Sequence, residues 1–284
     1  MNHDHDNEVS RHLPTVLVLA GHDPTGGAGL IADAESVAAC GGWALTVPTA
    51  LTVQNCHDVI AVSPVTGSAI RQAAGALREM PLEAIKIGLI ADLETLDAVV
   101  DVVRQRPGIP VVADPVLRAG GGCELATQEL IDAYCERLLP LVDILTPNRQ
   151  ELARLAGTDY GDDTERAVSL MRQGCQALLV TGTDTPLERV PADRVEHILH
   201  APDVDRQWSW PRLPGQFHGS GCTLSSALAT RLAVGESLVA ACEQAQVFTW
   251  QALAHGWHSG VGQRLPRRLW RLPPASFALD EVKV

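Results

Sequence analysis

The sequence lacks several features that would place it in a common class of protein. No uninterrupted apolar run reaches the roughly 20 residues that a membrane-spanning helix needs. Positive charge is scarce, because 22 lysines and arginines stand against 34 acidic residues and leave a net charge of −12. This balance argues against nucleic acid or an anionic membrane as the main partner, although a local site can still bind an anionic substrate.

The cysteines also form no recognisable framework. All seven are scattered, and none stands in a C-x-x-C spacing. An odd, dispersed set predicts reduced thiols in a cytoplasmic protein and argues against disulfides and a zinc site. The N-terminus MNHDHDNEVSRH has no apolar core and is not expected to be a secretory signal. We predict a disordered tail over 1–13, one folded domain over 14–259 and a loosely packed C-terminal tail over 260–284.

What the sequence does contain is a regular series of short apolar runs and longer amphipathic segments. The runs are rich in Val, Ile and Leu with little polar alternation, as expected for strands buried on both faces of a mostly parallel sheet. Their alternation with helical segments is typical of a doubly wound α/β fold. The predicted strands are Thr15–Ala20, Ala44–Ala50, Ala84–Ile90, Val111–Asp114, Val142–Thr146, Ala177–Thr181 and Val195–His200. The predicted helices are Ala28–Cys40, Gly67–Met80, Leu93–Arg106, Thr127–Leu139, Thr164–Gln173, Ser220–Ala233 and Ser237–Ala254.

Ligands of open α/β sheets bind at the carboxyl ends of the strands, so the residues there are the candidates for a site. The first strand ends in AGHDPTGGAGLIAD, which matches neither the dinucleotide fingerprint nor the P-loop pattern. Its glycines allow the backbone to approach a ligand. The carboxylate of Asp33 either accepts hydrogen bonds from a heterocycle or is a solvated acid at a helix start. Gln54, at the end of ALTVQN, offers both a donor and an acceptor.

Further strand ends carry polar residues. Lys86 lies in KIGLI and Asp114 in ADPV, while Asn148 and Glu151 stand three residues apart in LTPNRQE. The last two residues fit a helix N-cap and its capping-box partner. That interpretation leaves Glu151 able to hold water around a magnesium ion.

The stretch HGSGCTLSSALAT, 218–230, places a Gly-Ser-Gly turn and a cysteine at the start of an apolar helix. The backbone N–H groups of Gly219, Ser220, Gly221 and Cys222 would be unpaired there, which makes an anion site. Phosphoryl transfer needs such donors where charge collects on the migrating group. We expect the helix start to favour the thiolate of Cys222. The alternative is a small residue that fills space at a helix start.

Taken in order, AGHDPTGGAGLIAD, ALTVQN, KIGLI, DPV, LTPNRQEL, VTG and HGSGCTLSSALA resemble the hydroxymethylpyrimidine/phosphomethylpyrimidine kinases of thiamine biosynthesis, in the ribokinase-like superfamily. The resemblance spans 14–255 and implies a three-layer α/β/α kinase domain with a mostly parallel central sheet. It implies ATP- and Mg²⁺-dependent phosphorylation of 4-amino-5-hydroxymethyl-2-methylpyrimidine and then of its monophosphate, giving the pyrophosphate. It also favours a homodimer.

The resemblance implies roles for individual residues as well. The implied contacts of the aminopyrimidine are Gly21, Asp33, Gln54 and Leu89. The implied contacts of ATP are Asn148, Thr181, Gly182 and Thr183. The implied magnesium ligands, directly or through water, are Asp114 and Glu151. The implied anion hole and catalytic residues are Gly219, Ser220, Gly221 and Cys222. In this scheme Cys222 takes the place of the catalytic aspartate of sugar kinases and is the base or a positioning group for the acceptor hydroxyl.

Several positions depart from the family pattern. Leu89 stands where the pattern has Met, which conserves volume. Thr181 and Gln246 stand where relatives often have lysines that would touch phosphate, so one phosphorylation step is weakened unless magnesium, the helix start or Arg118 compensates. Two alternatives therefore stay open. One is a pyridoxine or pyridoxal kinase of the same fold, and the other is a pyrimidine-binding homologue with weakened turnover.

Overall fold

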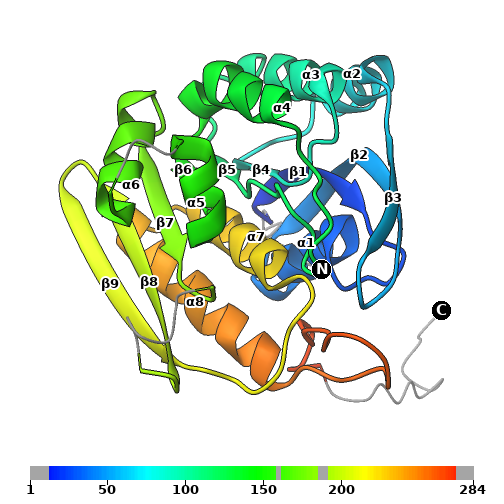
Figure 1. The fold of residues 1–284 in the computed structure, drawn as a ribbon. Helices are drawn as coiled ribbons and strands as arrows, with labels where there is room; N and C mark the ends of the chain where they lie inside the picture. Colours follow the sequence, from blue (N-terminus) through cyan, green and yellow to red (C-terminus); the bar gives the residue numbers. More distant parts are fainter. Residues whose placement is uncertain (1–12, 158–160, 185–190, 273–284) are drawn as a thin grey trace, which may run out of the picture.

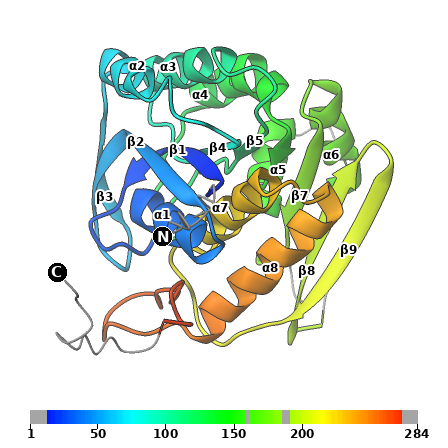
Figure 2. The same cartoon turned by 180° about the vertical axis from the view of Figure 1, so that it is seen from behind.

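A computed structural model describes residues 13–157, 161–184 and 191–272, and these form three layers with a sheet between two sets of helices (Figures 1 and 2). In sheet order the described strands run β3-β2-β1-β4-β5-β6-β7-β8-β9. Neighbours from β2 to β7 pair in parallel, whereas the pairs β2–β3, β7–β8 and β8–β9 are antiparallel. The strands are β1 Thr15–His22, β2 Trp43–Gln54, β3 Val59–Pro64, β4 Ala84–Ile87, β5 Val111–Ala113, β6 Ile144–Leu145, β7 Ala177–Thr181, β8 Arg194–Ala201 and β9 Val204–Pro211.

Each face of the sheet buries its own apolar layer, because successive side chains of a strand point to opposite faces. In β1, Leu17 and Leu19 pack with the layer of α2–α6, whereas Val16 and Val18 pack with the layer of α1, α7 and α8. All four are at most 1% exposed. The helices are α1 Gly29–Ala39, α2 Gly67–Ala76, α3 Leu93–Arg104, α4 Gln128–Ala133, α5 Arg149–Ala156, α6 Asp163–Arg172, α7 Ser220–Ala233 and α8 Leu238–Ala254.

The predicted fold class is confirmed, and the differences lie at the edges of the sheet and in one helix. The sequence interpretation missed β3 and β9, whose side chains are largely half-buried or exposed and therefore show no continuous apolar run. The single helix predicted over Thr127–Leu139 divides into α4, a π-helical turn and a 3₁₀ turn. Pro140 stands in the 3₁₀ turn, where its missing N–H prevents the chain from returning to a regular α-helix.

The prediction of a loosely packed C-terminal tail is wrong for the described part of that tail. Leu265 is buried and its backbone pairs with Trp257, while Arg264 pairs with Phe217 ahead of α7. Arg268 is only 3% exposed. Composition suggested a tail because prolines and arginines dominate the segment, yet its backbone hydrogen bonds are made to other parts of the fold. The predicted N-terminal tail over 1–12 and the remainder of the C-terminal one lie outside the described residues.

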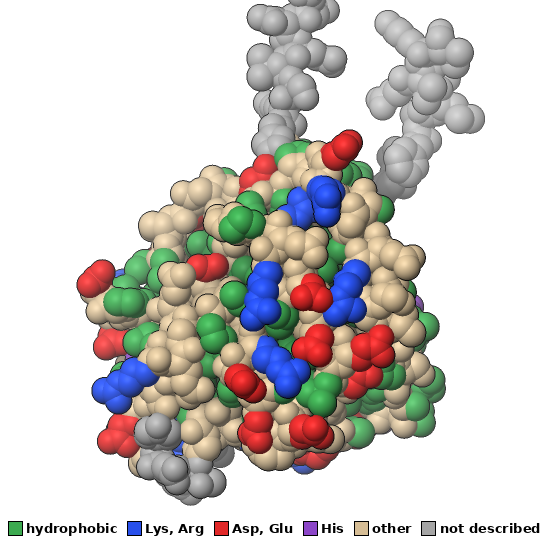
Figure 3. Space-filling model, turned by 90° about the horizontal axis from the view of Figure 1, so that it is seen from above, with side chains coloured by type: hydrophobic (Ala, Val, Ile, Leu, Met, Phe, Trp, Pro, Cys, Tyr) green, Lys and Arg blue, Asp and Glu red, His purple; other side chains and the backbone are tan. Residues whose placement is uncertain are grey.

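The surface agrees with the charge balance of the sequence. Seen from above, on the side of α2, α3 and α4, acidic and basic side chains are interspersed and no extended basic patch forms on that face (Figure 3). Exposed ion pairs there include Arg71 with Asp101 and Arg137 with Asp97. Such a face offers nothing for the phosphate backbone of a nucleic acid. No helix in the described part of the chain has the length and apolar character needed to cross a membrane.

Candidate active site

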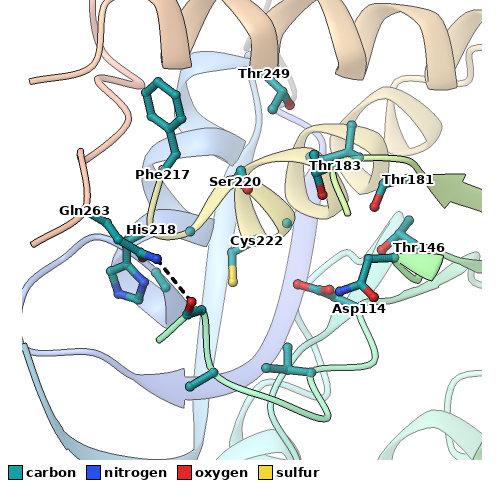
Figure 4. Close-up of a pocket in the computed structure, with 18 of the residues that line it drawn as sticks. Asp114, Thr146, Thr181, Thr183, Phe217, His218, Ser220, Cys222, Thr249 and Gln263 are labelled. Carbon is teal, nitrogen blue, oxygen red and sulfur yellow. Dashed lines mark hydrogen bonds between the residues drawn. The ribbon is translucent and has the colours of Figure 1, made fainter. Parts of the chain in front are cut away.

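A cavity of about 760 Å³ lies at the carboxyl ends of the parallel strands, beside the start of α7 (Figure 4). This is the edge at which the sequence pattern placed the site. The predicted residues that line it are Gly21, Gln54, Leu89, Asp114, Asn148, Glu151, Thr181, Thr183, Gly219, Ser220, Gly221 and Cys222. Asp33 and Gly182 are not among the lining residues. The cavity therefore brings together segments that are far apart in the sequence, from the end of β1 to the second half of α8 and Gln263 beyond it.

The glycine-rich loop after β1 is organised by Asp23, which the sequence interpretation did not single out. Its buried carboxylate accepts hydrogen bonds from the Thr25 N–H at 2.8 Å, the Thr25 hydroxyl at 2.9 Å and the Ala28 N–H at 2.8 Å. The ring of His218 bonds the same carboxylate at 2.7 Å. Burial raises the pKa of Asp23, but these hydrogen bonds, led by that of His218, bring it below its usual value. The Asp-Pro-Thr-Gly turn was the available signal, since Asp in a turn often bonds the backbone two residues ahead.

The first turn of α7 leaves backbone N–H groups available to a ligand. Its N-cap, Gly219, provides no side-chain cap, and its φ of 86° is a left-handed conformation that favours glycine. Within the described chain no acceptor is found for the N–H groups of Ser220, Gly221 and Cys222. Free N–H groups and the helix dipole together favour an anion in the cavity.

At the start of α5, which also lines the cavity, the backbone N–H groups already have hydrogen-bond partners. Asn148 accepts from the Glu151 N–H at 2.8 Å and Glu151 accepts from the Asn148 N–H at 2.9 Å, so the predicted capping box is present. The next two N–H groups, of Arg149 and Gln150, donate to the Asp184 carboxylate at 3.2 and 2.9 Å. The starts of α5 and α7 thus both lie at the cavity, and of these two α7 is the one that keeps its donors for a ligand.

The expectation of a stabilised Cys222 thiolate is wrong for the protein without ligands. Burial raises the pKa of the Cys222 thiol to about 12, although the nearby charge of Lys86 and the Gly29 N–H oppose the shift. The carboxylates of Asp33 and Asp114 raise it further. Figure 4 shows the sulfur pointing from the start of α7 into the cavity, on the side where Asp114 lies. Cys222 is thus a protonated thiol at the mouth of the anion site.

The structure gives Asp33 a different place from the one predicted. Its side chain is 0% exposed, and both its oxygens accept from the Lys86 ammonium at 2.9 Å. The Ser226 hydroxyl donates to the same carboxylate at 2.7 Å. A direct contact between Asp33 and a substrate is therefore not made from this position. Burial lowers the pKa of Lys86, but the surrounding negative groups, led by Asp33, raise it above its usual value, so that the buried ammonium stays charged.

The position of the Lys86 ammonium explains why glycine occupies the third position of the Lys-Ile-Gly sequence. Lys86 and Gly88 point to the same face of the strand end, and a Cβ atom built on Gly88 would lie 2.9 Å from the Lys86 Nζ atom. The missing side chain of Gly88 therefore leaves the space into which the ammonium folds. Lys86 lines the cavity, so this motif at the end of β4 contributes to the cavity wall through the ammonium that Gly88 leaves room for.

Asp114 and Glu151 form the acidic part of the cavity. Burial, and then the charge of Asp114, raise the pKa of Glu151 to about 8, and burial likewise raises the pKa of Asp114. Two buried carboxylates with raised pKa values suit a divalent cation, whose positive charge favours their ionised forms. No group of three or more His, Cys, Asp or Glu side chains in the described chain could hold a metal alone. The donor set therefore fits Mg²⁺, which keeps several waters and takes its other ligands from phosphates.

The surroundings of Gln246, which stands at the position of the second expected lysine, suit a neutral side chain. Gln246 is 2% exposed, accepts from the Trp210 indole N–H at 2.9 Å and donates to the Cys242 carbonyl at 2.9 Å. Beside it, burial lowers the pKa of His197 to about 4, against a hydrogen bond with Gln246 that raises it. A lysine at 246 would find an indole donor and a neutral imidazole there in place of a carboxylate.

Other cations take part in lining the cavity. The chain has two lysines, of which Lys283 lies outside the described residues. In the described chain the arginines that line the cavity are Arg118 and Arg212. Arg118 donates to the Gly122 carbonyl at 2.8 Å, and Arg212 to the Thr183 carbonyl at 3.4 Å. Their guanidinium groups are the cations at hand where Thr181 replaces the other expected lysine.

We predict that Lys86→Met lowers the free energy of unfolding by about 3–5 kcal/mol, because it leaves the Asp33 carboxylate buried without a counter-charge. The double variant Lys86→Met/Asp33→Leu should recover most of that loss, since neither charge remains. Urea unfolding of both variants and the unaltered protein measures the difference. A single variant as stable as the unaltered protein would show that the pair is not coupled.

We also predict a pH-dependent contribution from His197. Its pKa of about 4 lies below its ordinary value of 6.5, so the unfolded chain binds more protons between these pH values. The free energy of unfolding should therefore fall as the pH drops from 6.5 to 4, by on the order of 3 kcal/mol from this residue. Urea unfolding of His197→Gln should show a correspondingly smaller decrease over the same range. Equal decreases in both proteins would contradict the assignment.

Comparison with known proteins agrees with this site. The family model described as phosphomethylpyrimidine kinase matches residues 23–266. The hydroxymethylpyrimidine/phosphomethylpyrimidine kinase of Rhizobium meliloti is 34% identical over 265 residues, which cover 87% of this chain and 93% of that protein. A thiamine biosynthesis multifunctional protein of Corynebacterium efficiens is 35% identical over 84% of this chain, which spans only 33% of that longer protein.

A solved structure supports the fold independently. Pyridoxal kinase from Staphylococcus aureus, in complex with pyridoxal, superposes with a TM-score of 0.80 over 91% of this chain and 95% of that one. At 22% identity this likeness concerns the fold alone. The family match covers most of the chain, and the relatives named above share its sequence well beyond the motifs of the cavity. The chain therefore belongs to the phosphomethylpyrimidine kinase family and is a phosphotransferase.

Proposed function

We propose that this protein uses ATP to phosphorylate 4-amino-5-hydroxymethyl-2-methylpyrimidine and then its monophosphate, the two steps that give the pyrophosphate in thiamine biosynthesis. The observation that carries the proposal is the open start of α7, whose free N–H groups face a cavity that also holds Cys222 and Asp114. Membership of the phosphomethylpyrimidine kinase family supports it. The relatives of similar length are named as kinases of these two pyrimidines.

The chemistry of transfer is mainly positioning and charge stabilisation, because the migrating phosphoryl group passes through a loose transition state. The N–H groups of Ser220, Gly221 and Cys222 would receive the negative charge on that group. Since the Cys222 thiol is protonated near neutral pH, it orients the acceptor oxygen and does not remove the proton in advance. As the bond from phosphorus to the ADP oxygen breaks and the new bond to the acceptor oxygen forms, the proton of the acceptor hydroxyl passes to an oxygen of the transferred phosphoryl group.

Magnesium, when bound, neutralises charge on the nucleotide phosphates and keeps them in line with the acceptor. In this chain Asp114 and Glu151 would hold it, at least partly through water. Asn148 and Thr183 would border the nucleotide from α5 and the end of β7, with Thr181 beside them. The cavity wall formed by Arg118 and Arg212 would supply the positive charge that lysines give in relatives.

The pyrimidine would occupy the end of the cavity near β1 and β2. Gly21 and Leu89 pack closely there, since a Cβ on Gly21 would lie 3.0 Å from the Leu89 Cδ2 atom, and this leaves a flat apolar wall. Gln54 at the end of β2 would pair its amide with the aminopyrimidine edge. Asp33 would act on the substrate only through Lys86, because its own oxygens are used.

The proposal includes the setting of the enzyme. We propose a homodimer, supported by the exposed apolar side chains of Leu51, Val53 and Ile60 on the β2–β3 edge, which are 52–70% exposed. Light scattering of the purified protein measures this. A cytoplasmic location is supported by the cysteines, all seven of which are free thiols.

A product analysis tests the proposed reaction. Incubation with ATP, Mg²⁺ and hydroxymethylpyrimidine should yield the monophosphate and then the diphosphate of the pyrimidine, both identified by mass. Pyridoxal serves as the parallel substrate, because pyridoxal kinases share the fold. Faster phosphorylation of pyridoxal than of the pyrimidine would favour the runner-up, a pyridoxal kinase. Pyrimidine binding without release of ADP would favour a homologue with weakened turnover.

A substitution tests the role of the thiol. We predict that Cys222→Ser lowers kcat by at least about tenfold, in line with the usual loss when a positioned group at the reacting oxygen is altered. The KM for the pyrimidine should change less than about threefold, because the ring contacts lie elsewhere. Steady-state kinetics at saturating ATP measure both constants. An unaltered kcat would show that Cys222 only fills space at the start of α7 and does not position the acceptor oxygen.

A further inference from the structure

Arg268 lies two residues beyond the part of the chain that the family model matches, and it is nevertheless one of the most buried charged residues of the fold. Its side chain is 1% exposed. The guanidinium makes hydrogen bonds to three separate segments. Nε donates to the Thr223 hydroxyl at 2.9 Å, Nη1 to the Gly26 carbonyl and the Glu35 carboxylate at 3.2 Å each, and Nη2 to the Gly27 carbonyl.

Two consecutive peptide groups of the glycine loop are each held at both ends as a result. In the first, the Gly26 carbonyl accepts from Arg268 and the Gly27 N–H donates to the Thr25 hydroxyl at 3.1 Å. In the second, the Gly27 carbonyl accepts from Arg268 and the following N–H donates to the Asp23 carboxylate at 2.8 Å. Neither peptide group can rotate without breaking a hydrogen bond at each end.

The same loop touches the start of α7. A Cβ atom on Gly219 would lie 1.8 Å from the Gly27 carbonyl oxygen, so the two backbones are in direct contact. One turn into α7, the Thr223 hydroxyl donates to the Gly219 carbonyl at 2.8 Å while it accepts from Arg268. Arg268 therefore bonds both sides of this contact, the glycine loop and the first turn of the helix.

We propose that Arg268 is a positioning residue for phosphoryl transfer, which holds the glycine loop after β1 against the first turn of α7. Arg268 does not line the cavity, so it acts through these two segments. The N–H donors of Ser220, Gly221 and Cys222 stay aimed into the cavity because the turn before them cannot shift. Transfer depends on such alignment, since small displacements of positioning groups lower the rate strongly.

The geometry requires an arginine. The planar guanidinium presents five donors in a rigid fork, and here they reach a hydroxyl, two carbonyls and a carboxylate in different directions. A lysine keeps the charge but offers one ammonium at a single point. Arg267, the preceding residue, is exposed. It therefore provides a matched control in which the same change is made without loss of these contacts.

The experiment compares Arg268→Lys and Arg268→Met with Arg267→Met in the full-length protein. Each is first assayed for folding by circular dichroism and urea unfolding, and kinetics are measured well below the unfolding transition. We expect kcat to fall by about tenfold or more in both Arg268 variants, with the KM for the pyrimidine within about threefold of the control. A third variant, Arg268→Ala, leaves space for the missing group, so millimolar guanidinium should restore part of its activity, and urea at the same concentration should not.

Backbone hydrogen exchange gives a readout that does not depend on the reaction, although the kinetic arm rests on the proposed function. Exchange over 25–29 and 219–223 should be faster in Arg268→Lys than in Arg267→Met. If the unaltered protein shows no turnover, the proposed function fails, and exchange alone decides whether Arg268 positions the loop. The inference is overturned if exchange is unchanged, if kcat stays within about twofold of the control, or if the loss only follows the unfolded fraction. Failure of all the Arg268 variants to fold would likewise assign the residue to stability.

Discussion

The contact on which the site depends is the one between the Gly27 carbonyl and the Gly219 backbone. No side chain fits between them, and the two residues are separated by most of the chain. The contact sets the start of α7 against the loop after β1, and the donors at that start therefore face the cavity. Asp23 and Arg268 stabilise the contact from two sides. The Asp23 carboxylate accepts hydrogen bonds from N–H groups, and the Arg268 guanidinium donates hydrogen bonds to carbonyl groups.

Charge is distributed so that an acidic protein can still bind phosphate. The fully buried ammonium of Lys86 is matched by Asp33 and therefore adds little net charge to the cavity floor. Gln246 adds none, because Trp210 and the Cys242 carbonyl use its amide. What remains for an anion is the helix start, whose donors carry partial charge without a side chain, and in the proposed reaction a divalent cation that Asp114 and Glu151 would hold. Both act locally, which is why the net charge of the whole surface does not oppose them.

Sequence patterns located the strand ends of the site well, since buried parallel strands give continuous apolar runs and their ends meet at one edge. The capping box of Asn148 and Glu151 could be recognised because its two residues lie three positions apart. The Gly-Ser-Gly turn could be recognised because its residues are consecutive. We expected Asp33 to contact the substrate because no residue near it in the sequence indicates its ion pair with Lys86, which lies 53 positions further along the chain. The edge strand β3 and the buried segment around Leu265 escaped notice because partial exposure and many arginines hide the apolar pattern.

By itself, the sequence determined the order of the parallel strands and of most helices, the edge of the sheet where the cavity lies, and the family through motifs whose residues are close together. Those features depend on periodicity and on local hydrogen bonds, which a short stretch of chain encodes. Only the tertiary structure decided that α7 and not α5 keeps its donors, which charges are paired beneath the cavity, and that a C-terminal arginine reaches the glycine loop. Each of these depends on contacts between segments from distant parts of the chain, and no local pattern records them.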